Sequence, residues 1–233
     1  MKLLYCLPLL LLPIATLAIE VHPCFELSPN DQPEISVPAC TNAILSDTFE
    51  GAKLGEAYSN RGVANRELGN LEESASDLET SIKIDSSTNT LRMLAWTYRE
   101  MSRYAEAETI YTNTLDADDH WQGWLSRCVV RQDLEKYQLA LKDCKEALIR
   151  DPDNPDAAFL TARAFNFLGQ GNLALPLANK ATELEPERSY YWSELAWAAH
   201  LSGNTADAIT LAEDALERFP GEADLTDFLN AVR

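Results

Sequence analysis

The segment that decides the fold occurs three times in the second half of the chain: YQLALKDCKEALIRDP at residues 137–152, GNLALPLANKATELEP at 171–186 and TADAITLAEDALERFP at 205–220. The copies start 34 residues apart, and each keeps two alanines and a final proline in the same places. A fixed period of this size is typical of proteins built from stacked repeats. Such folds usually bind other proteins, so the sequence predicts the architecture in detail and the function as a class. The matching sets are Ala140, Ala174 and Ala208; Ala147, Ala181 and Ala215; and Pro152, Pro186 and Pro220.

The composition fits one globular or solenoid domain. The chain has 233 residues, of which 46% are hydrophobic and 24% are charged. Its formal net charge of −18 argues against nonspecific binding to nucleic acid or to an anionic membrane, because both require clustered positive charge.

Residues 1–18 read as a secretory signal peptide. Lys2 precedes an apolar run from Leu3 to Leu17, and Thr16 and Ala18 are small residues at the −3 and −1 positions of a cleavage site. The alternative is a membrane anchor, but Pro8 and Pro13 interrupt the run, which is shorter than the ~20 residues that a spanning helix needs. We therefore expect a periplasmic or secreted protein that is not inserted in the membrane once the signal is removed.

The cysteine content agrees with export. Cys6 would leave with the signal, and Cys24, Cys40, Cys128 and Cys144 remain. An even number of cysteines in an exported chain suggests two disulfides. Three pairings are possible, and sequence distance favours 24–40 with 128–144. For the second pair the alternative is two small buried apolar residues.

The N-terminal part of the mature chain, residues 19–53, reads as a proline-rich extension and a leading helix. Pro23, Pro29, Pro33 and Pro38 disfavour a long helix or a central strand. We expect an extended segment up to about residue 39, followed by a short helix over 40–53.

Helical units alternate from Gly55 onward. Each unit holds an apolar segment, a turn and a second apolar segment. Glycine at such a turn supplies the left-handed backbone that ends a helix. Residues 223–233 form a last short helix that covers the exposed end of the stack. The expected units are 55–87, 88–120, 121–154, 155–188 and 189–222, with turns at Gly69, Ser102, Glu135, Gly169 and Gly203.

These units resemble the tetratricopeptide repeat, whose pattern of tryptophan, leucine, alanine and proline positions recurs over 34 residues. The fifth unit matches best, with Trp192, Leu195, Ala208 and Pro220, and the first is the weakest. The resemblance covers residues 55–222. It implies an all-α, right-handed superhelical solenoid of about five helix hairpins with a C-terminal capping helix, in which the first helices line a concave face.

The resemblance also implies which side chains line the concave groove. They fall at positions 2, 5, 9 and 12 of each unit, and the third unit supplies Gln122, Leu125, Val129 and Gln132. A lysine–asparagine carboxylate clamp, found in some members of the family, is absent here. The groove residues that we expect to bind a partner are Arg66, Arg92, Trp96, Arg99, Phe159, Arg163, Asn166, Tyr190, Trp197 and His200.

Arginines and aromatic residues dominate that set, although the chain as a whole is acidic. These residue types are enriched at binding hot spots. We hypothesise a groove for an extended or helical peptide, with a carboxylate that Arg92, Arg99 or Arg163 could hold. The alternative is that these side chains are packing or solvated surface.

Motifs for catalysis or cofactor binding are missing from the sequence. The three histidines fall far apart, and there is no HExxH, CxxC, phosphate loop or dinucleotide fingerprint. We expect no metal, no cofactor and no enzyme activity, but a scaffold or adaptor that binds a protein or peptide ligand. The alternatives are a regulatory subunit of an envelope enzyme complex and a glycan-binding protein that uses Trp96 and Trp197. The oligomeric state stays open.

Overall fold

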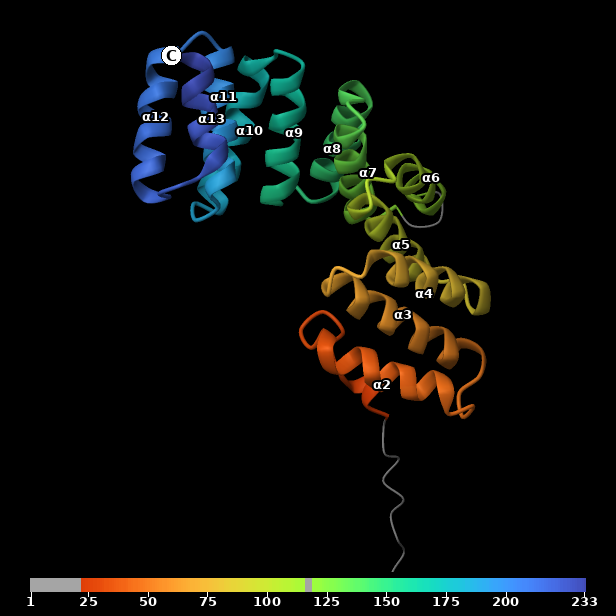
Figure 1. The fold of residues 1–233 in the computed structure, drawn as a ribbon. Helices are drawn as coiled ribbons and strands as arrows, with labels where there is room; N and C mark the ends of the chain where they lie inside the picture. Colours follow the sequence, from red (N-terminus) through yellow and green to blue (C-terminus); the bar gives the residue numbers. More distant parts are fainter. Residues whose placement is uncertain (1–21, 116–118) are drawn as a thin grey trace, which may run out of the picture.

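The computed structural model describes residues 22–115 and 119–233. The described part of the chain contains thirteen helices and no strand, so the prediction of an all-α solenoid is confirmed (Figure 1). The signal peptide expected at residues 1–18 lies outside the described residues.

Five helix hairpins follow one another and each packs on the next. Consecutive helices are the main contact partners along the whole stack. The hairpins are α3 (Gly51–Glu67) with α4 (Leu71–Ile84), α5 (Thr88–Glu100) with α6 (Tyr104–Leu115), α7 (Trp121–Asp133) with α8 (Tyr137–Arg150), α9 (Pro155–Phe167) with α10 (Gly171–Leu184), and α11 (Ser189–Leu201) with α12 (Thr205–Arg218). The capping helix α13 (Ala223–Val232) packs against both α11 and α12.

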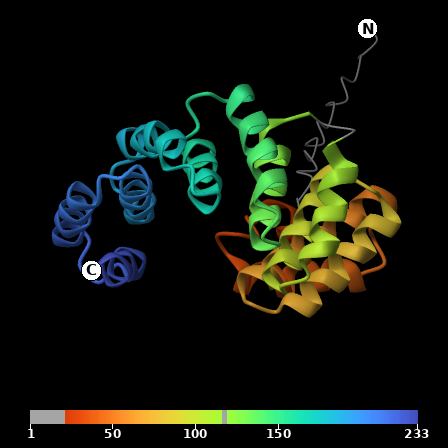
Figure 2. The ribbon, with the colours of Figure 1, turned by 90° about the horizontal axis from the view of Figure 1, so that it is seen from above.

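The stack curves because its two sides are packed differently. First helices of neighbouring hairpins contact each other, as α3 does with α5, α7 with α9, and α9 with α11, whereas the second helices of neighbouring hairpins form no comparable contacts in the described chain. The side with the first helices is therefore the shorter, inner side. Figure 2 shows the resulting arc, with α2 to α6 in one arm and α9 to α13 in the other.

Small residues allow the helices to approach closely. The repeated alanines Ala140, Ala174 and Ala208 are all fully buried. Gly171 is more tightly packed still, because a Cβ atom at this position would lie 2.5 Å from the carbonyl carbon of Leu201. The hairpin α9–α10 can pack this closely against α11 only if residue 171 is a glycine.

The turns within the hairpins use left-handed backbone. Gly69, Gly169 and Gly203 have positive φ angles, and Ser102 and Glu135 adopt the same conformation with φ of 59° and 57°. Glycine tolerates this conformation without cost, while other residues reach it only under strain.

The prediction of an extended segment up to residue 39 is wrong. Residues Pro23–Glu26 form α1 and Pro33–Leu45 form α2, with Pro38 inside the helix. Pro33 stands in the first turn, where a missing N–H is no loss, and Pro38 lies on the exposed side and removes one hydrogen bond. The burial of Cys40 and Ala43 against Cys24 and Ala57 offsets that loss.

The cysteines lie in two pairs. Cys24 and Cys40 are at disulfide distance with Cα atoms 4.5 Å apart, and Cys128 and Cys144 likewise with Cα atoms 5.3 Å apart. This arrangement is compatible with the pairing that sequence distance favours. In the second pair, Cys128 of α7 meets Cys144 of α8 where the two helices cross.

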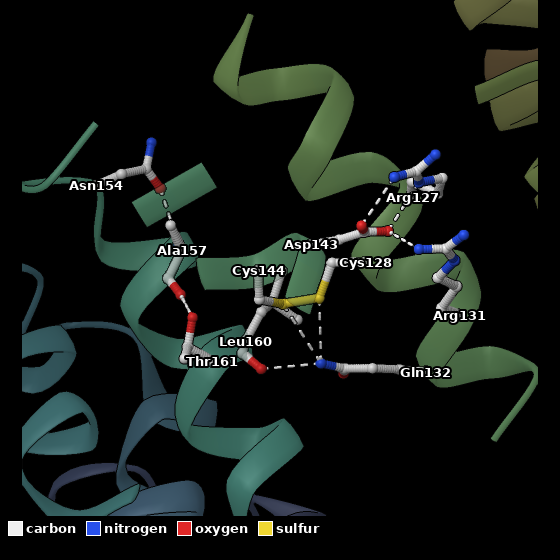
Figure 3. The surroundings of a disulfide bond; sticks show 10 residues. All are labelled: Arg127, Cys128, Arg131, Gln132, Asp143, Cys144, Asn154, Ala157, Leu160 and Thr161. Atoms are coloured by element: carbon white, nitrogen blue, oxygen red, sulfur yellow. Dashed lines mark hydrogen bonds and ion pairs between the residues drawn. A yellow bond between two sulfur atoms is a disulfide. The ribbon is translucent and has the colours of Figure 1, made fainter. Parts of the chain in front are cut away.

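A buried ionic cluster reinforces the same hairpin (Figure 3). The carboxylate of Asp143, which is 0% exposed, accepts two hydrogen bonds from Arg127, of 2.8 and 2.9 Å, and one of 2.6 Å from Nη1 of Arg131. Arg61 and Asp77 form a similar bidentate pair in the first hairpin. Each Arg–Asp pair spans a separation of 16 residues, as each cysteine pair does. This separation joins residues that face each other at the crossing of a hairpin.

Candidate functional site

The first cleft of the inner face, which we call the basic cleft, lies between α3, α5 and α7. It has a volume of about 510 Å³, and Arg66, Arg92 and Trp96 enter it from the first two of these helices. None of the described residues that line it is acidic, although the chain carries a net charge of −18. The remaining lining residues are Asn30, Asn89, Met93, Tyr111, Trp121, Gln122, Leu125 and Ser126.

Contacts with neighbouring residues hold the arginines of the basic cleft. Nη2 of Arg66 donates to Oδ1 of Asn30 at 3.4 Å and to Oε1 of Glu67 at 2.5 Å, and the Arg66 side chain is 11% exposed. A guanidinium nitrogen of Arg92 lies 3.9 Å from the position that a Cβ of Gly123 would occupy. Arg92 therefore reaches the start of α7, while the missing Cβ of Gly123 leaves space for Leu115, which would lie 2.9 Å from it.

The floor of the basic cleft contains a buried phenol. Tyr111 is buried there, and its burial raises the pKa of the phenol. The guanidinium groups of Arg99, Arg66 and Arg92 act in the opposite direction on the same pKa, because positive charge favours the phenolate. Arg66 and Arg99 also pair with Glu67 and Asp133, so their charges are partly compensated.

Trp96 supplies the main exposed apolar surface of this cleft. Its side chain is 41% exposed, and its indole Nε1 donates to Oε1 of Glu100 at 2.8 Å. The hydrogen bond fixes one edge of the ring and leaves its faces to the cleft and to Arg99, whose guanidinium lies 5.8 Å from the ring centroid.

The second cleft, which we call the acidic cleft, lies between α9, α11 and α13. It consists of two hollows of about 320 and 190 Å³ that share Arg163, Phe167, Glu194 and Trp197. Three carboxyl groups face one guanidinium in it. The further lining residues are Asn166 and Leu201 in the larger hollow, and Phe159, Tyr190, Ser193, Asp224 and Asp227 in the smaller.

Glu194 is the central polar group of the acidic cleft. Its side chain is 14% exposed, and burial raises its pKa, with a further increase from the charge of Asp224. Nδ2 of Asn166 donates to Oε2 of Glu194 at 2.8 Å and to its backbone carbonyl at 3.0 Å. Nε of Arg163 stays 3.8 Å away. These two groups lower the pKa again but do not saturate the carboxylate.

Residues of one hydrophobic cluster line both clefts. Leu125 lines the basic cleft, Phe159 and Tyr190 line the acidic cleft, and all three belong to this cluster. The two clefts therefore share part of their underlying core.

Most of the groove residues predicted from the repeat positions line one of these clefts. Arg66, Arg92 and Trp96 meet in the basic cleft, and Phe159, Arg163, Asn166, Tyr190 and Trp197 meet in the acidic cleft. Their binding role stays a prediction.

Four of the groove residues named from the repeat positions line neither cleft, and one of them, Val129, packs against a buried hydrophobic cluster. Arg99 forms an ion pair with Asp133 at 2.5 Å, and His200 forms a hydrogen bond of 3.0 Å with Thr205. Gln132 is buried, donates to the carbonyl of Leu160 at 2.9 Å and lies beside the sulfur atoms of the second cysteine pair. The expectation that Gln132 lines the groove is therefore wrong.

The structure also adds residues that the repeat positions do not include. Trp121 and Phe167 stand at the start and the end of their helices, and Asn30 comes from the segment between α1 and α2. Asp224 and Asp227 come from α13, which the repeat pattern does not cover. The sequence signal that could have indicated Trp121 is its place at the start of a first helix.

The described residues show no group of histidine, cysteine and carboxylate side chains that could hold a metal ion. Within the same residues, no helix combines the length and the apolar character needed to cross a membrane.

Sequence comparison identifies the repeats. Profiles described as Tetratricopeptide repeat match residues 55–88, 92–155 and 167–223. The chain belongs to the tetratricopeptide repeat family. The fold of this tetratricopeptide repeat protein is that of a protein–protein interaction scaffold, and proteins of this kind are generally non-catalytic. No curated protein matches the chain.

Several solved tetratricopeptide repeat structures are similar in fold. YrrB, described as a TPR protein with an unusual peptide-binding site, has a TM-score of 0.63 at 19% identity, covering 81% of this chain and 96% of its own. MamA from Desulfovibrio magneticus RS-1 has a TM-score of 0.65 at 18% identity, covering 72% and 97%. A thermophilic TPR protein from Thermus thermophilus, TTC0263, has a TM-score of 0.61 at 18% identity, covering 76% and 98%. At these identities the likeness concerns the fold alone.

Proposed function

We propose that this tetratricopeptide repeat protein binds a segment of a partner protein along its inner face, without catalysis. The basic cleft carries the proposal. It gathers two arginines and an exposed tryptophan, with no lining carboxylate among the described residues, in a chain whose net charge is −18.

The chemistry of the basic cleft suits a peptide that carries a carboxylate. Arg66 is 11% exposed and pairs with Glu67, so a carboxylate of the partner would have to compete with Glu67 for it, at a place where an ion pair is stronger than on an open surface. Arginine and tryptophan are also the residues most enriched among binding hot spots. Trp96 offers its faces to an apolar side chain of the same segment.

Selection from a displayed library of random peptides on the immobilised protein tests this function. We expect enrichment of peptides with acidic and apolar residues, and we expect the variant Arg66→Ala/Trp96→Ala to lose about tenfold or more in affinity for them. The matched control is Arg103→Ala/Leu139→Ala, which removes an arginine and an exposed apolar side chain outside both clefts.

Two outcomes would contradict the proposal. The first is the absence of any enriched peptide, and the second is enriched peptides that bind the Arg66→Ala/Trp96→Ala variant as tightly as they bind the unmodified protein. Binding to a glycan array that is lost with Trp96→Ala would favour the glycan-binding alternative, since Trp96 is the exposed tryptophan of the basic cleft.

We infer, in addition, that the protein acts in the periplasm or outside the cell. The two cysteine pairs at disulfide distance support this location, because disulfides persist in oxidising compartments. Mass spectrometry of the natively expressed protein after alkylation, with and without prior reduction, tests it. We expect alkylation of all four cysteines only after reduction, and alkylation without reduction would contradict the inference.

A further inference from the structure

The acidic cleft holds more carboxyl groups than cations. Glu194, Asp224 and Asp227 line it, and Arg163 is the cationic side chain among its lining residues. Asp224 and Asp227 lie exposed on α13, and neither forms an ion pair within the part of the chain that the structure describes. The cleft therefore offers carboxylates that the described chain does not neutralise.

We propose that the acidic cleft binds one basic side chain of the partner segment, from a lysine or an arginine, between the carboxylates and the aromatic rings of its walls. The inference rests on the proposed function, because it requires that the inner face takes a partner segment. It adds which residue type that segment brings to the C-terminal end of the stack. It does not depend on the charge of the basic cleft.

Glu194 is a buried carboxylate that its own chain compensates incompletely. Burial raises its pKa, and the charge of Asp224 raises it further, so the folded protein disfavours the ionised form. Arg163 stays 3.8 Å away, and Asn166 donates one side-chain hydrogen bond. Asn166 also has an unused acceptor, because its buried Oδ1 has no hydrogen-bond partner among the described residues. A cation with N–H donors would favour the ionised form of Glu194 and would offer the donor that Asn166 lacks.

Aromatic rings form the other walls of the smaller hollow. Phe159, Tyr190 and Trp197 line it. Edge-to-face contacts hold these rings in place, since the centroids of Phe159 and Tyr190 lie 5.1 Å apart and those of Trp197 and Phe228 lie 5.0 Å apart. The face of an aromatic ring attracts a cation, and tryptophan does so most strongly. A lysine or arginine side chain can also bury its apolar stem against such a wall.

A guanidinium of the protein itself already uses this combination of groups. The guanidinium of Arg163 lies 5.6 Å from the centroid of the Phe167 ring, and its Nε lies 3.8 Å from Oε1 of Glu194. The Arg163 side chain is 42% exposed and makes no closer ion pair with a described residue. We expect the cation of the partner to enter the smaller hollow, on the side of Asp224 and Asp227, where it competes with Arg163 for Glu194.

Other charged groups fit this cleft less well. A carboxylate of the partner would meet three carboxyl groups and one guanidinium. A metal ion would need converging ligands, and the described residues contain no group of histidine, cysteine and carboxylate side chains that could hold one. Arg188 donates to the hydroxyl of Tyr190, but it also pairs with Glu185, so its charge is compensated. The lining therefore favours an organic cation.

Blocked amino acids test the site with one side chain at a time. The probes are the Nα-acetyl amides of lysine, arginine, norleucine and glutamate, and NMR follows the indole N–H signals of the five tryptophans during each titration. The variant Trp197→Phe identifies the signal of Trp197. We expect the lysine and arginine probes to shift this signal saturably and to bind at least about fivefold more tightly than norleucine, which has the stem without the ammonium. We expect no saturable shift with the glutamate probe.

Variants of the carboxylates separate this site from the general attraction of cations to an acidic chain. Glu194→Gln should weaken binding of the lysine probe about tenfold, and Asp224→Asn/Asp227→Asn about threefold. The matched control is Asp207→Asn/Asp214→Asn, which removes two exposed carboxylates of α12 outside both clefts and should change little. Equal weakening by the two double variants would show nonspecific attraction and would overturn the inference.

Arg163→Gln gives the sharpest result, because its effect has opposite signs for a cation site and for an anion site. Removal of the competing guanidinium should tighten binding of the lysine probe about threefold, whereas an anion site would lose its cation. Weaker binding of the lysine probe by this variant, norleucine binding as tight as lysine binding, or saturable binding of glutamate would each overturn the inference.

Failure of the cation site and failure of the proposed function give different results. If the lysine probe does not bind while library peptides still bind and still require Arg66 and Trp96, the cation site alone is lost. If the lysine probe binds in the acidic cleft but no library peptide is enriched, the proposed function is lost, and with it the role of the site in holding a partner segment.

Discussion

The third hairpin and the C-terminal hairpins use buried carboxyl groups in different ways. Asp143 in the third hairpin is fully buried and accepts three hydrogen bonds from two arginines. Glu194, near the C-terminus, receives one side-chain hydrogen bond from Asn166 and has a guanidinium at 3.8 Å. The first carboxylate is saturated by its own chain and holds two helices together, whereas the second accepts fewer hydrogen bonds from its own chain.

The packing of the two regions differs in the same way. The crossing of α7 and α8 carries a cysteine pair and an ionic cluster, while the corresponding crossing of α9 and α10 carries the buried alanines Ala162 and Ala178. One repeat geometry therefore tolerates two solutions, one with polar connections and one with small residues. Four predictions test how far this difference extends.

The largest effect is expected for Asp143→Ala in the third hairpin. Removal of the carboxylate leaves the buried guanidinium of Arg127 without its acidic partner, while Arg131 keeps Glu108, and the loss of such a buried partner costs about 3–5 kcal/mol in the free energy of unfolding. Urea denaturation followed by circular dichroism measures the change. The control Asp153→Ala removes an exposed carboxylate paired with Lys180 and should change little. Similar values for the two variants would show that the cluster does not stabilise the hairpin.

The second prediction concerns the cysteine pair of the third hairpin. Its sequence separation is 16 residues. Closing a loop of this size stabilises a chain by about 3 kcal/mol in the chain-entropy model, so Cys128→Ala/Cys144→Ala should lose an amount of this order. The loss should be seen under non-reducing conditions and vanish when both proteins are measured with a reductant. If the variant were less stable than the unmodified protein by the same amount with and without reductant, the loss would come from packing and not from a disulfide.

The third prediction concerns Gly171 at the start of α10. A Cβ there would lie 2.5 Å from the backbone of Leu201, so Gly171→Ala must displace α11 and should cost about 1–3 kcal/mol in thermal or urea denaturation. The neighbouring exposed Asn172→Ala serves as control. Unchanged stability of the Gly171→Ala variant would mean that α10 and α11 do not approach each other as closely as this distance indicates.

The smallest effect is expected for Glu194→Gln. Because burial raises the pKa of Glu194 in the folded protein above that in the unfolded chain, its contribution to stability is lost as the pH rises through the folded-state pKa. The glutamine variant should therefore be slightly more stable than the unmodified protein at neutral pH, and equally stable below the ordinary pKa of a glutamate. Denaturation curves of both proteins at several pH values test this. A difference in the free energy of unfolding that stayed constant at all pH values would exclude an effect of Glu194 ionisation.

The sequence was sufficient to predict the repeats because their geometry depends on short, periodic signals. Alanines such as Ala174 and Ala208 mark the helix contacts, and glycines such as Gly169 and Gly203 mark the turns. The helix from Pro33 was not predictable from these signals, since its stability comes from burial against α1 and α3 rather than from local preference.

The candidate site was predictable only in part. The repeat positions select side chains by their place on a helix, and this succeeds for Arg92 and Trp197. It fails for Gln132, which the neighbouring cysteines and the carbonyl of Leu160 draw into the interior. It also cannot include Asp224 and Asp227, because the path of α13 across the end of the stack follows no period.

The contact between α7 and α9 has a mechanical consequence. It joins the arm that holds the basic cleft to the arm that holds the acidic cleft, and the hydrogen bond from Gln132 to Leu160 lies at this joint. The packing of α8 on α9 joins the same two arms, so the distance between the two clefts depends on both α7 and α8. We expect a change at Gln132 to alter this distance, while the residues that line each cleft stay the same.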